Sequence, residues 1–233
     1  MAKIGGIMGK PSINAEFSNF FRCINEYTDL LVKVIEAREV SVAPEKGTDI
    51  STALLRSEKK LVHEAFVLKI YVAWEVLVED VFVECLYRDP SEYAKHKGIS
   101  LPRRLTRGIC RGLISGLGYF DFKDVSGLKG MAKRALTATC NPFARISPSS
   151  ADKIDEFHII RNYLSHYSDT SRQALSRMYR NRYDSTFREP GDFLLDTVEF
   201  VEFGEHGEHT RFANYTNAFI KAADEMASFL GVY

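Results

Sequence analysis

Two residues with complementary chemistry, Arg161 and His166, lie five positions apart in the sequence. The guanidinium of an arginine is permanently charged and forks onto phosphate oxygens, whereas an imidazole takes up and releases a proton near neutral pH. Together they supply what metal-free phosphodiester transfer needs, which is proton transfer and stabilisation of the developing charge. Asn162, next to the arginine, adds an amide that can orient the phosphate or the imidazole.

The helix that should carry these residues begins near residue 152, with Ser150 as an N-cap-like residue and an acid in its first turn. His158, Asn162 and His166 recur every four positions, so they form a polar stripe that should point away from the core. The apolar side that should face the core consists of Ile154, Phe157, Ile160, Leu164 and Tyr167.

Arg161 and His166 are about 140° apart around the axis of such a helix. They meet if the long arginine bends across the helix, or they converge on a ligand between two chains. Ser165 and His158, on the neighbouring turns, are possible supporting residues around Arg161. A carboxylate of an earlier long helix, for which Glu75 is the candidate, would pair with Arg161 or orient His166.

An arginine, a polar residue, three more residues and a histidine, late in an all-helical chain, resemble the arginine–histidine signature of the HEPN superfamily. The segment Ala73-Trp74-Glu75 and the later segment 190–194, Pro-Gly-Asp-Phe-Leu, are most similar to the RiboL-PSP-HEPN subgroup. The resemblance implies a small α-helical bundle that dimerises about the motif helices. Many members of the superfamily are metal-independent endoribonucleases of toxin–antitoxin and phage-defence (antiviral) systems.

For this chain the resemblance implies an RNA substrate, no cofactor, and an antitoxin or regulatory protein as a further partner. His166 would exchange the proton of the ribose 2′-hydroxyl, and Arg161 would stabilise the charge on the phosphorane. Asn162 would orient the phosphate or the imidazole. The expected products are a 2′,3′-cyclic phosphate and a 5′-hydroxyl, so DNA should not be cleaved.

The composition predicts an ordered chain of 233 residues, because 45% of the residues are hydrophobic and only seven are proline. We expect a flexible segment 1–11, without a signal peptide, and one helical domain over 12–233 with a basic insertion around 93–150. The cysteines are scattered without a Cys-x-x-Cys pair, which is typical of reduced thiols in a cytoplasmic protein. They are Cys23, Cys85, Cys110 and Cys140.

Helical periodicity predicts an all-α bundle of about six or more helices. The expected helices cover 12–38, 50–87, 129–139, 152–167 and 211–230, and a further short helix ends near 183 after a turn and N-cap over 168–171. We also expect a loop over 40–48, turn-rich sequence over 108–130, at most a small β-hairpin near 193–203, and a turn over 204–209. The segment 65–86 is apolar nearly all round and should be the central helix. A membrane span is disfavoured there, because Lys69, Glu75 and Asp80 interrupt it.

The neutral total charge conceals a basic middle, since residues 93–188 contain 18 Lys plus Arg and 7 Asp plus Glu, a local charge of +11. Such a region suits a polyanion. Arg104, Arg107 and Arg111 would present guanidinium groups on one helical face, and Arg172 and Arg177 are interleaved with tyrosines further on. For the first three arginines we weigh RNA binding evenly against pairing with acidic residues of the same chain. For Arg172 and Arg177 the equal alternative to RNA binding is an ordinary amphipathic surface.

Two groups of residues raise the question of a metal. Glu75, Glu79 and Asp80 lie on one helix, but no histidine accompanies them, and such acids are more often a solvated edge. His206 and His209 lack a third ligand nearby and are expected to be solvated. We therefore expect no metal site.

Three readings of the motif remain open at this point. The first is a metal-independent endoribonuclease with a composite cleft in a homodimer. The second is a non-catalytic module of the same fold that binds RNA or nucleotide, or serves as a dimerisation platform. In the third, Arg161 and His166 are structural and satisfy buried carbonyl groups at the end of a helix.

Overall fold

The computed structural model describes residues 13–40, 56–102, 104–116, 124–202 and 205–232. The described residues form nine α-helices, two short 3-10 helices and one hairpin, so the fold is all-α with a small two-stranded sheet. In chain order the elements are α1 (Asn14–Val40), α2 (Arg56–Arg88), α3 (Ser91–Lys97), α4 (Arg107–Gly116), α5 (Val125–Ala135), η1 (Ala138–Cys140), η2 (Pro142–Arg145), α6 (Pro148–His166), α7 (Asp169–Tyr183), α8 (Pro190–Leu194), β1 (Thr197–Glu202), β2 (Glu205–Thr210) and α9 (Arg211–Leu230).

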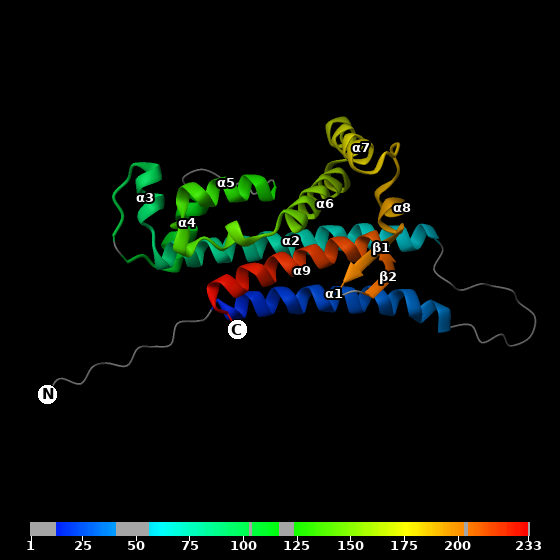
Figure 1. Cartoon of the computed structure of the whole chain (residues 1–233), viewed down its shortest axis with the longest axis horizontal. Coiled ribbons are helices and arrows are strands. Elements are labelled where there is room, and N and C mark those ends of the chain that lie inside the picture. The colour runs from blue at the N-terminus through cyan, green and yellow to red at the C-terminus, as the bar shows by residue number, and fades with distance from the viewer. Residues whose placement is uncertain (1–12, 41–55, 103, 117–123, 203–204, 233) are drawn as a thin grey trace, which may run out of the picture.

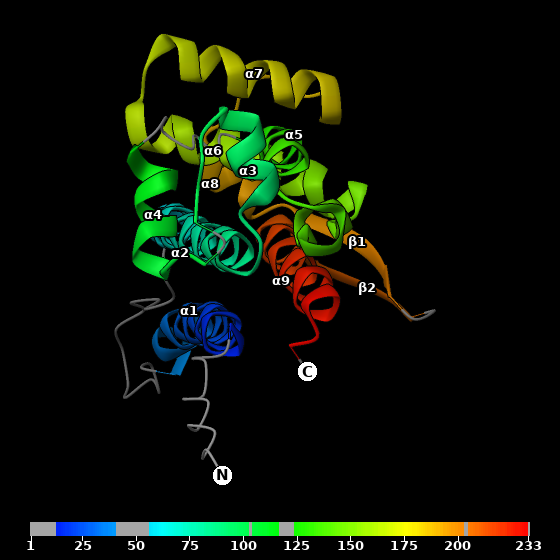
Figure 2. The ribbon, with the colours of Figure 1, turned by 90° about the vertical axis from the view of Figure 1, so that its left-hand side faces the viewer.

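Three long helices, α1, α2 and α9, run side by side and form the body of the molecule (Figure 1). The short helices α3, α4 and α5 lie at one end, and α8 and the hairpin lie towards the other. Helix α6 leaves the body obliquely and α7 packs on it. When the bundle is seen end on, α7 lies across it as an outer layer (Figure 2).

The core of the bundle is built on aromatic rings of four helices. The ring of Phe219 in α9 lies 5.5 Å from that of Trp74 in α2 and 5.0 Å from that of Phe157 in α6. Phe20 of α1 completes the cluster at 6.1 Å from Trp74. These edge-on contacts join all four helices, because aromatic rings favour such geometry.

Helix α2 is the central helix, as the sequence predicted, because it packs against α1, α4, α6, α8 and α9. Its segment 81–86 is buried on every side. Apolar surface nevertheless remains exposed on α2 before this segment, at Val72 (52%) and Val76 (55%). No helix in the described ranges combines the length and the apolar composition that a bilayer span requires.

The N-cap of α6 lies three residues earlier than predicted. Ser147, not Ser150, is the N-cap, and its hydroxyl accepts a hydrogen bond from the Ser150 backbone N–H at 3.4 Å. Pro148 occupies the first helical position, where its missing N–H costs nothing and its fixed φ suits the helix. The cap of α7 lies within the predicted segment 168–171: Ser168 is the N-cap and forms a capping box with Ser171.

Two local predictions after residue 90 are wrong. The region around 108–130 is not mainly turns, because Gly108 and Gly112 lie within α4 and Gly127 and Gly130 within α5. Segment 193–194 is helical, and the expected turn over 204–209 is mostly strand β2, which pairs antiparallel with β1 from Thr197↔Thr210 to Glu202↔Glu205. The predictions for 1–11, for 41–48 and for the start of the second helix at 50–55 lie outside the described residues.

Candidate functional site

Arg161 lies in the second turn from the end of α6 and is held by residues of two helices. Its Nη2 is 3.6 Å from Oε1 of Glu75 in α2, and its Nη1 donates to Oδ1 of Asn162 at 3.1 Å. The guanidinium also stands over the ring of Tyr71, 5.3 Å from the centroid. The side chain is 25% exposed, so the arginine is fixed in position but remains accessible.

A chain of hydrogen bonds continues from Asn162 to the core. Because Asn162 Oδ1 accepts from Arg161, its Nδ2 donates to Nε2 of His158 at 2.8 Å. Nδ1 of His158 then carries the ring proton and donates to the hydroxyl of Tyr71 at 2.7 Å. This geometry selects the neutral Nδ1–H tautomer, since a proton on Nε2 would face the amide hydrogens. We call these five residues, Glu75, Tyr71, His158, Arg161 and Asn162, the Arg161 network.

The prediction that His158 and Asn162 point away from the core is wrong. Both are half-buried and turn towards Tyr71 of α2, a fully buried tyrosine. Burial, with a smaller contribution from the negative charge of Glu75, raises the pKa of Tyr71 well above its ordinary value, so its hydroxyl stays neutral. The periodicity of α6 alone gave no sign that α2 covers this side.

His166 lies at the other limit of the motif, as the last residue of α6. It is exposed, and so is the supporting candidate Ser165. Within the described part of the chain, the imidazole of His166 has no hydrogen bond or ion pair and does not contact Arg161. The fold of the single chain therefore does not bring the two motif residues together.

Tyr167 was expected to face the core but is 65% exposed. Tyr167 is the C-cap of α6 and has a left-handed backbone (φ 46°). The helix ends there, so the side chain of Tyr167 does not lie on the buried side of α6. The other four predicted core residues of α6 are buried, and Glu156 and Tyr163 are buried with them.

The expected row of three arginines on one face of a helix is not formed. Arg104 precedes α4 and is exposed. Arg107 donates to Glu84 of α2 at 2.7 Å, and Arg111 binds Glu79 at 3.1 Å as well as Asp80. Arg107 and Arg111 thus form ion pairs with acidic residues of the same chain, as the alternative to RNA binding predicted.

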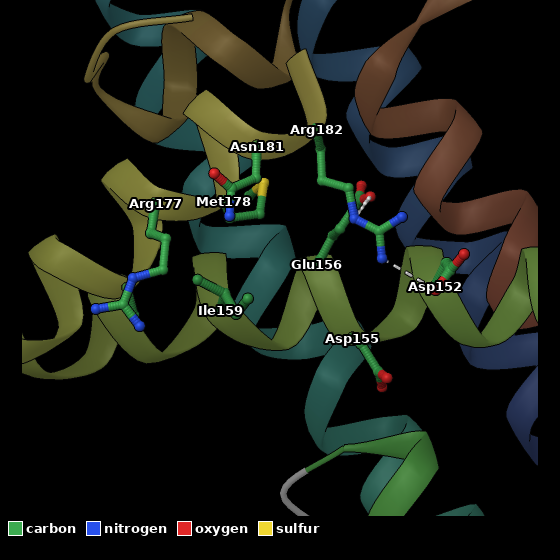
Figure 3. A pocket seen from close by; sticks show the side chains of 9 residues that line it. Asp152, Asp155, Glu156, Ile159, Arg177, Met178, Asn181 and Arg182 are labelled. Carbon is green, nitrogen blue, oxygen red and sulfur yellow. Dashed lines mark hydrogen bonds and ion pairs between the residues drawn. The ribbon is translucent and has the colours of Figure 1, made fainter. Parts of the chain in front are cut away.

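Helices α6 and α7 enclose a pocket of about 290 Å³ (Figure 3). Its lining combines both charges with an apolar wall and comprises Asp152, Asp155, Glu156, Ile159, Ala174, Arg177, Met178, Asn181 and Arg182. All three of its carboxylates are already bound within the chain. Arg182 pairs with Asp152 at 3.2 Å, and Figure 3 shows this bridge at one end of the pocket.

Glu156 in this pocket is 5% exposed and joins three elements. Its Oε2 accepts from the hydroxyls of Tyr183 at 2.5 Å and Tyr215 at 2.8 Å, and Lys153 lies 3.4 Å away. A buried carboxylate that is satisfied in this way stabilises the packing of α6, α7 and α9. The sequence gave no signal for it, because its partners lie 27 and 59 positions away.

Asp155, in contrast, points towards the start of α5 (Figure 3), where its Oδ1 accepts from the Val125 backbone N–H at 2.6 Å. Burial raises its pKa to about 6, and the nearby carboxylates of Asp124 and Asp152 add to the rise against the effect of the Val125 hydrogen bond. Within the described residues, no three His, Cys, Asp or Glu side chains gather as metal ligands would.

Comparisons with protein-family models, with curated proteins and with solved structures gave no match to this chain.

Proposed function

We propose that the protein is a metal-independent endoribonuclease of the HEPN type, in which Arg161 and His166 act on the scissile phosphate. The observation that carries the proposal is the contrast between the two residues. Arg161 is held in place by Glu75 and Asn162 with a quarter of its side chain exposed, while His166 is exposed at the end of the same helix. A preorganised cation and an unengaged imidazole suit phosphoryl transfer.

In the proposed reaction, His166 removes the proton of the ribose 2′-hydroxyl, and the 2′-oxygen attacks phosphorus. Arg161 stabilises the charge on the phosphorane oxygens. The bond from phosphorus to the 5′-oxygen then breaks, and this oxygen takes up a proton from water. The products are a 2′,3′-cyclic phosphate and a 5′-hydroxyl. Asn162, bonded to both Arg161 and His158, positions the guanidinium.

The separation of Arg161 from His166 within one subunit supports a composite cleft in a homodimer. Residues five positions apart on a helix diverge by about 140°. In the proposed dimer, Arg161 of one subunit faces His166 of the other, so each cleft draws one residue from each copy.

The first experiment measures cleavage of RNA in EDTA by the parent protein, Arg161→Ala and His166→Ala. We expect both variants to lose cleavage while their circular dichroism and thermal melting stay close to the parent. His96→Ala is the matched control, because His96 is an exposed histidine of α3 outside the motif. A 2′-O-methyl version of the RNA should not be cut, because it lacks the attacking hydroxyl.

Mixing the two inactive variants tests the composite cleft. A mixed dimer of Arg161→Ala and His166→Ala subunits holds one cleft with both residues intact and one with neither. After exchange of subunits, roughly a quarter of the parent activity should return. If each cleft instead took both residues from one subunit, mixing would restore nothing, and the dimeric site would be wrong.

A second candidate, a non-catalytic RNA-binding module of the same fold, draws support from the Arg161 network. The network uses the polar atoms of His158 and Asn162 for internal hydrogen bonds, as a structural motif would. This candidate predicts that the parent protein binds RNA but does not cleave it, and that Arg161→Ala lowers the melting temperature.

A further inference from the structure

One face of α7 forms a basic groove of about 370 Å³. Its lining comes entirely from this helix and consists of Arg172, Gln173, Ser176, Arg177 and Arg180. The lining contains three guanidinium groups, an amide and a hydroxyl, and no carboxylate. We call this surface the α7 groove.

The arginines of the α7 groove differ from most others in the described chain. Arg188 and Arg211 bind Asp196, just as Arg107 and Arg111 bind acidic residues of α2. In the described part of the chain, Arg177 and Arg180 have neither a hydrogen bond nor an ion pair, and both are exposed. Their charge is therefore not neutralised from within the chain.

Aromatic rings connect this groove to the candidate site. Tyr167, directly after His166, lies 5.2 Å from the ring of Tyr163, which lies 5.8 Å from that of Phe187. The guanidinium of Arg172 stands over Phe187 at 4.5 Å. The exposed ring of Tyr167 is thus at one end of a continuous line of contacts that reaches the first arginine of the groove.

The backbone of Tyr167 adds a second observation. A left-handed conformation is uncommon for a tyrosine, and glycine or asparagine adopts it more easily. The exposed Tyr167 therefore caps α6 in a backbone conformation that glycine or asparagine would adopt with less strain.

We propose that the α7 groove binds the phosphate backbone of a single RNA strand, with Tyr167 stacked on a base next to the scissile linkage. This inference rests on the proposed function, which identifies the polyanion as RNA. Arg172, Ser176 and Arg180 recur every four residues, about 6 Å along the helix, a step that suits successive phosphates of an extended strand. Basic side chains combined with stacking rings are the usual means of holding single strands.

A membrane surface fits the α7 groove less well. The apolar residues of α7, Leu175, Met178 and Tyr179, are buried against the rest of the protein. The helix therefore offers no apolar side chain to insert beside the headgroups, whereas membrane-surface helices expose such residues.

The test measures binding of a short fluorescent 2′-O-methyl oligoribonucleotide to the full-length protein, because this RNA cannot be cleaved. The double variant Arg177→Gln/Arg180→Gln should bind at least about tenfold more weakly, and the slope of log affinity against log salt should become shallower by about 1.4, as expected for two lost phosphate contacts to a single strand. Tyr167→Asn should weaken binding by about tenfold while the helix end remains intact, because asparagine tolerates the left-handed conformation.

Arg182→Gln is the matched control on the same helix. Arg182 is bound to Asp152 on the side that faces α6, so its loss should change the affinity by roughly twofold or less. Thermal melting of each variant shows whether weaker binding comes from unfolding. Equal losses in Arg182→Gln and in the double variant would overturn the proposal, as would unchanged binding by the double variant. Displacement of the RNA by a polyglutamate peptide at equal charge would also overturn it, because the groove would then take any polyanion.

The outcomes for the α7 groove and for the nuclease are separable. If the parent binds RNA through the α7 groove but cuts no RNA, the nuclease proposal falls and the groove stands. If cleavage requires Arg161 and His166 but neither binding nor cleavage responds to Arg177→Gln/Arg180→Gln, the groove proposal falls alone.

Discussion

Glu75 of α2 and Arg161 of α6 form an ion pair across the two helices, with 3.6 Å between carboxylate and guanidinium. The two side chains are 39% and 25% exposed, so water screens part of the attraction. The pair therefore contributes little to folding, and its main effect is to limit the positions that the guanidinium can take.

We expect Glu75→Gln to lower the rate of RNA cleavage without lowering stability by more than about 1 kcal/mol. Arg161→Lys should also be poorly active, because an ammonium keeps the charge but loses the fork of donors. Initial cleavage rates and thermal melting measure the two effects. Glu79→Gln is the matched control, since Glu79 lies one turn further along α2 and pairs with Arg111 instead. Equal cleavage by Glu75→Gln and Glu79→Gln would show that the carboxylate does not position Arg161.

The hydroxyl of Tyr71 allows a second prediction. Tyr71→Phe leaves the Nδ1–H of the half-buried His158 without its acceptor, so the free energy of unfolding should fall by about 1 to 2 kcal/mol. If the Arg161 network also positions the guanidinium, cleavage should fall as well. Tyr93→Phe serves as the control, because the buried Tyr93 donates to the Leu113 carbonyl, at the end with α3 and α4. It should destabilise the protein comparably and leave the cleavage rate per folded molecule unchanged.

Helices were predicted well where the signal, an apolar stripe or an N-cap, lies within the helix or next to it in the sequence. The apolar stripe of α1 and the stripe of α9 repeat at helical spacing, and Ser168 caps α7. Segments whose conformation depends on distant contacts were missed. Helix α8 begins at Pro190 and includes Phe193 and Leu194, where alternation suggested a strand. The carboxylate of Glu64 in α2 accepts a hydrogen bond from the backbone N–H of Gly191.

The candidate site shows the same division. The motif on α6 singled out Arg161, His166 and Asn162, and Glu75 was the candidate carboxylate of the long helix, which the structure places 3.6 Å from Arg161. Tyr71 could not be predicted, because it lies 87 positions from His158 and no short-range pattern links them. The pairing of Arg107 with Glu84 likewise depends on how α4 packs on α2, which charge counting along the sequence does not reveal.

Asp155 predicts a pH dependence of stability. Its pKa rises from 3.8 to about 6 on folding, so the native state binds more protons than the unfolded state between these values. The contribution of Asp155 to stability is therefore greatest below about pH 4 and is lost as the pH rises through 6. After allowance for the partial exposure of the group, the loss should be on the order of 1 kcal/mol.

Asp155→Asn isolates this effect, because the asparagine Oδ1 can still accept from the Val125 N–H but does not ionise. Unfolding by urea at several values between about pH 4 and pH 7 should show a smaller decline for the variant than for the parent. Parallel curves would mean that Asp155 titrates alike in the folded and unfolded states. Asp124→Asn is not a substitute, since that residue also caps α5 through the Gly127 N–H.

Gly191 is the point at which α8 approaches α2 most closely. A Cβ atom at this position would lie 2.4 Å from the Cβ and 2.9 Å from the Cα of Lys60, so backbone would have to shift. We expect Gly191→Ala to lower the free energy of unfolding by about 1 to 3 kcal/mol, as overpacking of a buried contact does. Gly112→Ala in α4 is the control, because no atom lies within 4 Å of its added Cβ and alanine favours the helix by up to about 1 kcal/mol. Urea unfolding of both variants should therefore give shifts of opposite sign. A neutral Gly191→Ala would mean that α8 moves away from α2 at little cost, and the close packing of the two helices would then not be what selects glycine at position 191.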